Sequence, residues 1–416
     1  MVTLNLGFLT KDFKVSRRKI VASTLLLGGA LAWFFLINAY IFDIFTSITP
    51  NEPLSNNYYN IGQALFYAFI IISAVIGSFI GKTISRSKLL LAWILLGTFS
   101  TIFLTFSQGP IFLLISGTLL GISFGWGLPI SMAFLADCTV IEERARVSGI
   151  TILTTFIIVF LTIAVKNIFA LEMTVALGLF ALVRLSSVVA LTLSVCDLRT
   201  HTQIKPLEIK SGAYREFALY LFPWLMFCVA GGLATNLIPE TSPFDSAVSL
   251  GNSLKYIFIA LFGLVSGIIA DRIGRRWPIR IGLVVLGISF ALLGVSMSWG
   301  SVVFYLATSG IAWGLFFTIF LAIPGDLSTP DSREKYYAIM YILPIGSLFA
   351  LSTIPGWAIF SNANSSSLSQ IFSIIIFLAI IPTLQAKETL PEEKIQNRKL
   401  KEHLENVEKI IKENKE

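Results

Sequence analysis

Long apolar runs separated by short charged segments dominate this sequence. Runs of about 20 residues, the length that lets a helix cross about 30 Å of hydrocarbon, recur from Ile20 to the region of Leu384. Hydrophobic residues make up 55% of the 416 positions and charged residues only 13%, which is too little polar surface to cover a soluble fold. The chain is therefore predicted to lie in a lipid bilayer.

We predict an all-α membrane protein with twelve transmembrane helices. Lipid cannot satisfy backbone polar groups, and none of the runs alternates between apolar and polar residues as a barrel strand does. The expected spans are residues 20–43, 60–80, 88–107, 110–136, 148–170, 172–195, 217–239, 249–270, 278–298, 301–325, 335–360 and 367–385.

The Lys and Arg residues gather on one side of this map. They precede the first span, follow every second span after it, and fill the tail from Lys387 onward. Because positive residues are enriched in cytoplasmic loops, both termini are predicted to be cytoplasmic in a protein of the plasma membrane. The net charge of +7 does not indicate a nucleic-acid partner, because the basic residues lie between apolar runs and share no soluble face.

A polar stretch divides the spans six and six. We expect a first half at residues 1–195, a cytoplasmic linker at 196–216, a second half at 217–386 and a charged cytoplasmic tail at 387–416. The tail carries Leu400, Leu404, Val407 and Ile411 at helical spacing. This stripe fits a solvated helix, a helix on the membrane surface or a partner-binding helix.

The two halves repeat each other. Residues in the first half recur 189 or 190 positions later, which favours duplication over a shared composition of helix-packing residues. The matched pairs are Gly121 with Gly310, Gly125 with Gly314, Asp137 with Asp326, Arg144 with Arg333, Gly77 with Gly267, Gly81 with Asp271, and Arg86 with Arg276.

The segment GIIADRIGRR, residues 267–276, lies between the eighth and ninth spans. It resembles the signature loop G-x-L-A-D-R-x-G-R-R of the major facilitator superfamily of secondary transporters, and Glu143 to Arg146 resemble that family's E-R-x-R after the fourth span. The resemblance implies two pseudo-symmetric six-helix halves that alternate access to a site between them.

The repeat and the resemblance together give a set of candidate gating residues at the cytoplasmic side. These are Gly267, Asp271, Arg272, Gly274, Arg275 and Arg276 in the second-half loop, Gly77, Gly81 and Arg86 in the first-half loop, and Asp137, Arg144, Asp326 and Arg333 beside the fourth and tenth spans. The resemblance implies that Asp271 caps the fifth span near Ser148 and Gly149. The first-half copy has Gly81 in place of the acid, so asymmetric gating is expected. The alternative is that these charges only fix topology.

A substrate site is expected near the midplane, where polar and aromatic residues of the first, fourth, seventh and tenth spans would line it. The candidates are Trp33, Asn38, Tyr40, Asp43, Trp126, Trp224, Asn236 and Trp313. Aromatic residues near the outer ends can equally be interface anchors. Asp43 is the candidate acid for proton coupling, with a role at the helix end as the alternative.

Three basic residues fall inside or near the outer half of spans. Arg184 lies deepest by its place in the sixth span, where an unpaired charge costs several kcal/mol, so it is a candidate contact for an anionic substrate or a partner of an acid within the membrane. The alternative is a structural ion pair or a side chain that extends to the interface. Lys166 and Lys255 are expected to extend their ammonium groups toward the outer interface.

We predict a transporter of a small molecule, an anion being one candidate, driven by a solute or ion gradient or acting as a facilitator. The sequence shows no phosphate-binding loop for ATP, and we expect no enzymatic activity, no cofactor, no metal and a monomer. A coupling ion such as a proton is one option. The alternatives are a non-transporting receptor or sensor with the same fold and a polytopic membrane enzyme.

Overall fold

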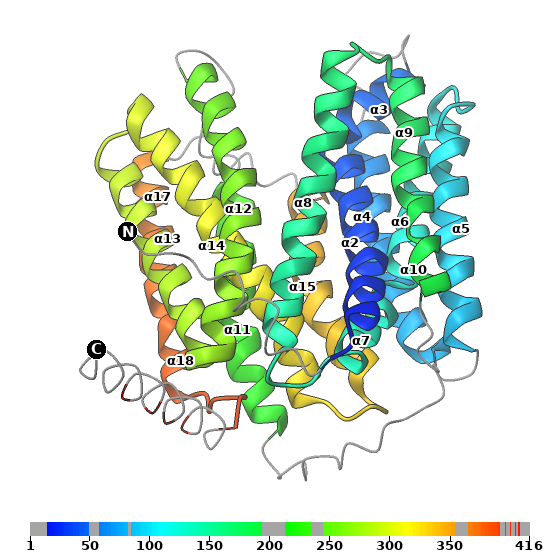
Figure 1. The fold of residues 1–416 in the computed structure, drawn as a ribbon. Coiled ribbons are helices and arrows are strands. Elements are labelled where there is room, and N and C mark those ends of the chain that lie inside the picture. The colour runs from blue at the N-terminus through cyan, green and yellow to red at the C-terminus, as the bar shows by residue number, and fades with distance from the viewer. Residues whose placement is uncertain are drawn as a thin grey trace, which may run out of the picture.

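The computed structural model describes residues 15–49, 58–81, 85–193, 213–234, 244–353 and 365–391, together with positions 396, 400, 404 and 407. Over these residues the protein is helical and has no β-strand. Figure 1 shows two upright bundles, with α2 to α10 on the right and most of the later helices on the left. Most of the linker expected at 196–216 lies outside the described residues, and α11 already begins at Ala213.

The first bundle contains the helices up to α10. They are α2 (Arg17–Ala39), α3 (Ile41–Ile48), α4 (Tyr58–Ile80), α5 (Arg86–Leu104), α6 (Pro110–Gly125), α7 (Leu128–Asp137), α8 (Arg144–Ile168), α9 (Met173–Ser186) and α10 (Val188–Leu193).

The second bundle begins with α11. Its helices are α11 (Ala213–Leu233), α12 (Asp245–Ile273), α13 (Arg276–Val295), α14 (Trp299–Leu327), α15 (Arg333–Thr353), α17 (Ser365–Leu378) and α18 (Ile380–Gln385).

Eleven segments of the described chain are long and apolar enough to cross a membrane. They correspond to eleven of the twelve predicted spans. The remaining prediction, 335–360, coincides with α15 up to Thr353, and its last residues lie outside the described part of the chain.

Several spans are not single helices as predicted. The first breaks at Tyr40 between α2 and α3, and the sixth breaks at Ser187 between α9 and α10. The fourth breaks at Trp126 and Gly127, and Pro129 then lies in the first turn of α7. A proline is accepted there because the first amides of a helix have no intrahelical partner.

The repeated glycines have the same packing role in both bundles. A Cβ atom at Gly121 of α6 would lie 2.5 Å from the carbonyl oxygen of Phe66 in α4. Gly310 of α14 packs in the same way against the backbone of Lys255 in α12. Small residues allow membrane helices to approach this closely, so the repeat in sequence is also a repeat of helix contacts.

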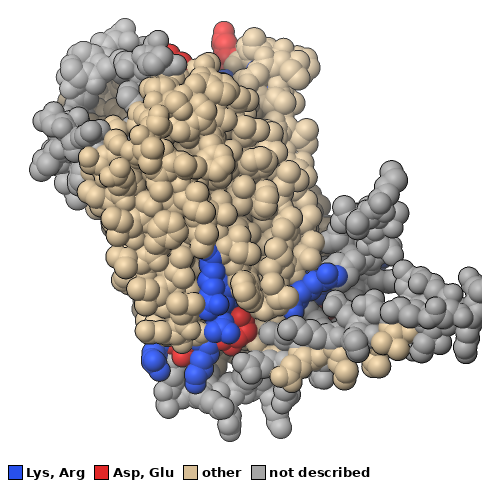
Figure 2. Space-filling model, turned by 90° about the vertical axis from the view of Figure 1, so that its left-hand side faces the viewer, with Lys and Arg blue, Asp and Glu red and all other residues tan. Residues whose placement is uncertain are grey.

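Charged residues gather at one end of the molecule. Figure 2 shows a largely uncharged side surface, with most of the blue and red side chains of this face at its lower end. This end contains the start of α8 and the ends of α7, α12 and α14. We call it the charged end, and the opposite one the far end.

Candidate functional site

Asp271, in the last turn of α12, is completely buried against the first turn of α8 in the other bundle. Its carboxylate accepts hydrogen bonds from the backbone N–H of Arg146 at 2.9 Å and of Ala145 at 3.3 Å. The first amides of a helix lack intrahelical partners and carry a partial positive charge, so a carboxylate is stabilised there. The structure thus contains the expected cap, but three residues before Ser148 and Gly149.

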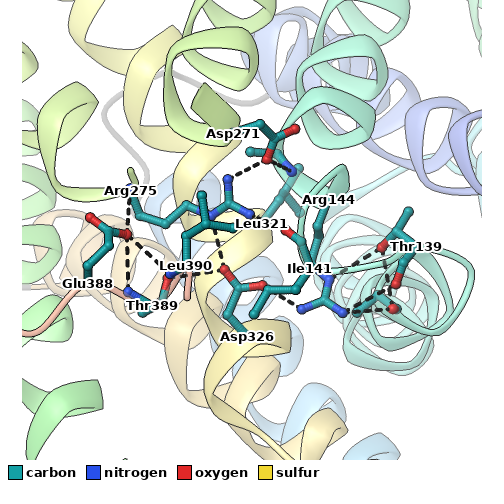
Figure 3. A network of polar contacts seen from close by, with 12 residues as sticks. Thr139, Ile141, Arg144, Asp271, Arg275, Leu321, Asp326, Glu388, Thr389 and Leu390 are labelled. Atoms are coloured by element: carbon teal, nitrogen blue, oxygen red, sulfur yellow. Dashed lines mark hydrogen bonds and ion pairs between the residues drawn. The ribbon is translucent and has the colours of Figure 1, made fainter. Parts of the chain in front are cut away.

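Arg275 joins Asp271 to a second buried acid, as Figure 3 shows. Its Nη1 lies 2.5 Å from Oδ1 of Asp271, and its Nε lies 3.0 Å from Oδ2 of Asp326. Its Nη2 donates to the carbonyl oxygen of Ile141, 2.6 Å away in the first bundle. A single guanidinium therefore connects the ends of α12 and α14 to the segment before α8.

Two ion pairs cross between the bundles in a pseudo-symmetric arrangement. Nη1 of Arg144 lies 2.5 Å from Oδ1 of Asp326, and Arg333 pairs with Asp137. The sequence repeat relates Arg144 to Arg333 and Asp137 to Asp326. The second pair is therefore the first pair with the two halves exchanged.

The first-half loop contributes a base to this end. Arg86 pairs with Asp137, and its Nη2 lies 2.5 Å from Oε1 of Glu334 in the second bundle. Gly81, which occupies the place of Asp271, lies at the end of α4, and a Cβ atom there would touch the side chain of Ile130. The two loops therefore differ in what they place between the bundles: the second-half loop contributes the acid Asp271, and the first-half loop contributes the base Arg86.

The beginning of the tail is part of the same network (Figure 3). Glu388 accepts from the backbone N–H of Arg275 at 2.7 Å, and the hydroxyl of Thr389 donates to Asp326 at 3.1 Å. Gly274 separates α12 from α13 with a φ of +116°, a conformation that L side chains rarely adopt, and it packs against the Glu388 carboxylate. Of the remaining gating candidates, Arg276 also pairs with Glu388, whereas Arg272 is exposed in the last turn of α12.

These contacts close the bundles against each other at the charged end. We call the participating residues the charged cluster: Arg86, Asp137, Arg144, Arg146, Asp271, Arg275, Asp326, Arg333 and Glu334. Removing one partner of a buried ion pair typically costs about 3–5 kcal/mol, because the other charge stays buried. Such a cluster can stabilise the conformation in which the two bundles are together at this end relative to one in which they are apart.

Helices α8 and α12 also meet through glycines near this end. A Cβ atom at Gly149 would lie 2.7 Å from the carbonyl oxygen of Gly263, and Gly267 packs directly against the carbonyl of Ala145. Toward the far end the ribbons of α8 and α12 diverge in Figure 1. The two helices thus touch along their lower parts, as small residues permit.

A chain of aromatic rings crosses between the bundles at mid-depth. We call these residues the midplane aromatic layer: Phe35, Phe156, Trp224, Tyr256, Trp313 and Phe317. Phe156 is the central residue of α8 and Trp313 the central residue of α14. The contacts between bundles are Phe156 with Tyr256, with ring centroids 6.0 Å apart, and Phe35 with Phe317, 5.8 Å apart.

Two of the sequence-predicted substrate candidates belong to this layer. Trp224 and Trp313 have ring centroids 5.9 Å apart, and Nε1 of Trp224 donates to the carbonyl of Met340. The other members were missed because the sequence search favoured polar side chains. Phe35, two residues after the predicted Trp33, could have been found from the aromatic content of the first span.

The other candidates are dispersed. Asn38 accepts a hydrogen bond from the hydroxyl of Tyr67, and Tyr40 lies at the end of α2 with the ammonium of Lys166 4.6 Å from its ring centre. Asp43 is exposed in the first turn of α3. Trp126 is half-buried at the break between α6 and α7. Asn236 lies outside the described residues.

Arg184 is completely buried inside the first bundle. Its guanidinium lies 3.9 Å from the ring centre of Trp93 and 5.4 Å from that of Trp33, and it donates to the carbonyl of Trp93. Gly97 leaves room for it, because a Cβ atom there would lie 2.6 Å from Nε of Arg184. Its contacts on α2 and α5 are those of a cation between aromatic faces, and it makes no ring contact with the midplane aromatic layer within the described part of the chain.

Comparisons with known proteins show which families and structures this chain is similar to. Residues 240–415 match the family model of the Major Facilitator Superfamily. Over 141 residues the chain is 28% identical to an uncharacterised MFS-type transporter of Methanocaldococcus jannaschii, covering 34% of this chain. The family model thus matches the second half of the chain. The matched region spans only about a third, 35%, of the length of that relative.

Solved structures of transporters share the fold over most of the chain. A human organic anion transporter superposes with a TM-score of 0.64 at 16% identity, covering 88% of this chain and 99% of its own. A proton:xylose symporter has a TM-score of 0.69 at 14% identity, covering 89% and 96%. A bacterial homologue of the iron transporter ferroportin, in an outward-facing state, has a TM-score of 0.64 at 15% identity, covering 88% and 98%. The protein is therefore an integral membrane protein with the fold of these transporters.

Proposed function

We propose that this protein is a secondary transporter that moves a small solute across the membrane by alternating access. The proposal rests on two sets of contacts that join the same two bundles at different depths. The charged cluster closes the bundles at one end, and the midplane aromatic layer joins them at mid-depth. A site that lies between two rocking bundles, with a breakable closure beneath it, is what alternating access requires.

We further propose that the charged end is cytoplasmic. The excess of Lys and Arg in the segments at that end supports this orientation, because positive residues are retained on the cytoplasmic side. The structure would then be closed toward the cytoplasm. The charges of the cluster are the groups that would separate when the protein opens inward.

The proposal is tested by labelling single cysteines from each side of the membrane. In a background without the native cysteines, we expect Asn252→Cys, an exposed position in the far-end part of α12, to react with a membrane-impermeant maleimide. Ser148→Cys, completely buried behind the charged cluster, should be protected. A transported solute should change the two rates in opposite directions.

Such reciprocal changes would support alternating access. The far-end position would become protected while the buried position becomes reactive from the charged end. A solute that binds but leaves both labelling rates unchanged would instead indicate a receptor or sensor. In that case the transport proposal would be wrong even though the fold is unchanged.

A further inference from the structure

The basic residue placed nearest mid-depth in the second bundle is Lys255 of α12. It lies four residues from residue 259, the centre of the helix, a rise of about 6 Å. The sequence predicts an ammonium group that extends to the outer interface, but α12 continues ten residues beyond Lys255 toward the far end, to Asp245. Its depth is therefore that of the midplane aromatic layer.

Lys255 lies on the face of α12 that is turned toward protein. The exposed stripe of this helix runs through Ser253, Ile257, Leu261 and Val265 at helical spacing. Lys255 is half-buried, its backbone packs against Gly310 of α14, and the next residue, Tyr256, touches Phe156 of the other bundle.

This lysine has no acidic partner at its depth among the described residues. Every acid of the described helices lies within the first four or the last three residues of its helix. The acids of the charged cluster are remote, because Asp271 follows Lys255 by 16 residues along α12, a rise of about 24 Å. An unpaired charge at this depth is costly, which indicates a counter-charge that the chain itself does not provide.

The surroundings define the rest of the ligand. The midplane aromatic layer offers ring faces and edges, which suit an aromatic group. Nε1 of Trp224 already donates to Met340, which leaves the hydroxyl of Tyr256 and Nε1 of Trp313 as the other polar side-chain groups of the layer. A sugar or another polyhydroxylated solute would need several hydrogen-bonding side chains that converge on it.

A second cation lies nearer the far end than Lys255. Lys166 is in the last turn of α8, with its ammonium over the ring of Tyr40. A positive charge at the entrance raises the local concentration of anions, whereas binding deeper inside depends on Lys255.

We infer that the site between the bundles takes an aromatic organic anion, with Lys255 as its counter-ion and the midplane aromatic layer as the surface for its rings. This inference deepens the proposed function and rests on it. It concerns the class of solute, whereas the proposed function concerns the movement of the protein.

The test uses the full-length purified protein and isothermal titration calorimetry. The probes are naphthalenesulfonate, the neutral naphthalenemethanol, the cation naphthylmethyl-trimethylammonium and the non-aromatic methanesulfonate. We expect naphthalenesulfonate to bind best, and Lys255→Gln to weaken its binding by at least about tenfold while changing naphthalenemethanol binding by less than about threefold. Lys255→Arg should retain binding, because it keeps the charge.

Lys166→Gln is the matched control, since it removes the same charge near the end of a helix. It should reduce naphthalenesulfonate affinity by no more than about threefold. Equal melting temperatures of the Lys255→Gln variant and the parent protein would show that the fold is intact. If Lys255→Gln melts at a lower temperature, the two affinities are compared within that variant, because partial unfolding reduces the binding of naphthalenesulfonate and of naphthalenemethanol alike. A lower ratio of naphthalenesulfonate affinity to naphthalenemethanol affinity than in the parent protein would still support the inference.

Unchanged sulfonate affinity in Lys255→Gln, or tighter binding of the cation than of the anion, would overturn the inference. Reciprocal labelling of Asn252→Cys and Ser148→Cys by the neutral or cationic naphthalene, and not by naphthalenesulfonate, would support the transport proposal. It would contradict the inference that the solute is an anion. If the sulfonate binds through Lys255 without reciprocal labelling, the site stands and the transport proposal fails.

Discussion

Replacing Asp271 with asparagine is expected to shift the protein away from the state closed at the charged end by on the order of thirtyfold, which corresponds to roughly 2 kcal/mol. The substitution keeps the shape but removes the charge that pairs with Arg275 and Arg146 and caps α8. Because α8 belongs to the other bundle, the contacts with Arg146 and with the backbone of α8 are made only while the two bundles are together. The variant should therefore raise the free energy of the closed state.

The labelling rate of Ser148→Cys from the charged end measures this shift, and it should rise in the Asp271→Asn background. Asp245→Asn is the matched control, because it makes the same chemical change at an exposed position at the far end of α12. We expect it to leave the labelling rate unchanged. Equal rates in the Asp271→Asn variant and the parent protein would show that this carboxylate does not hold the bundles together.

The helical architecture could be predicted because each span must be apolar over its whole length. Eleven of the predicted spans are found as membrane-crossing segments. The breaks at Tyr40 and Ser187 were not predicted, because short interruptions leave the hydropathy of a span nearly unchanged. The break before Pro129 had a signal, a Gly-Leu-Pro sequence that suits the beginning of a new helix.

The residues of the charged cluster were largely predictable, but their pairing was not. Repeat positions identified Asp137, Arg144, Asp326 and Arg333, since charges recur there at a fixed separation. Which acid meets which base depends on how the bundles face each other. Glu334 could not be found from the repeat comparison, and its ion pair with Arg86 joins residues 248 positions apart.

The midplane aromatic layer was only partly predictable for a related reason. Phenylalanine is common throughout the chain, with 34 copies, so composition does not distinguish a ring that faces lipid from one that faces the other bundle. Phe156 is completely buried and contacts Tyr256 of the second bundle, whereas its neighbour Ile157 is exposed. Only the rotation of α8 about its own axis separates the two environments, and that rotation is fixed by contacts with α2 and α12.

Arg184 shows the converse case. Its charge within an apolar span made it conspicuous in the sequence, but charge alone did not identify its surroundings. Its contacts with the rings of Trp33 and Trp93 depend on how α2, α5 and α9 pack together. A charged residue inside an apolar span can therefore be found from the sequence, whereas the residues that contact it are set by tertiary packing.

Adding a single methyl group at Gly149 is expected to keep the bundles apart at the charged end. A Cβ atom there would lie 2.7 Å from the carbonyl oxygen of Gly263 and 3.1 Å from Cα of Leu264, and neither backbone atom can move without shifting α12. Overpacking of this kind typically costs about 1–3 kcal/mol, and here the cost falls only on the state in which α8 and α12 touch. Gly149→Ala should therefore favour the state that is open at the charged end.

Gly178→Ala is the matched control, because it makes the same change in α9, where a Cβ atom would meet nothing within 4 Å. Alanine is the better helix former by about 1 kcal/mol, so both variants gain the same intrinsic helix stability and differ only in the contact with α12. Labelling of Ser148→Cys from the charged end should rise in Gly149→Ala and stay at the parent rate in Gly178→Ala. If both variants label at the parent rate, closure at the charged end does not require α8 and α12 to approach through their glycines, and the charged cluster alone would have to hold the bundles together.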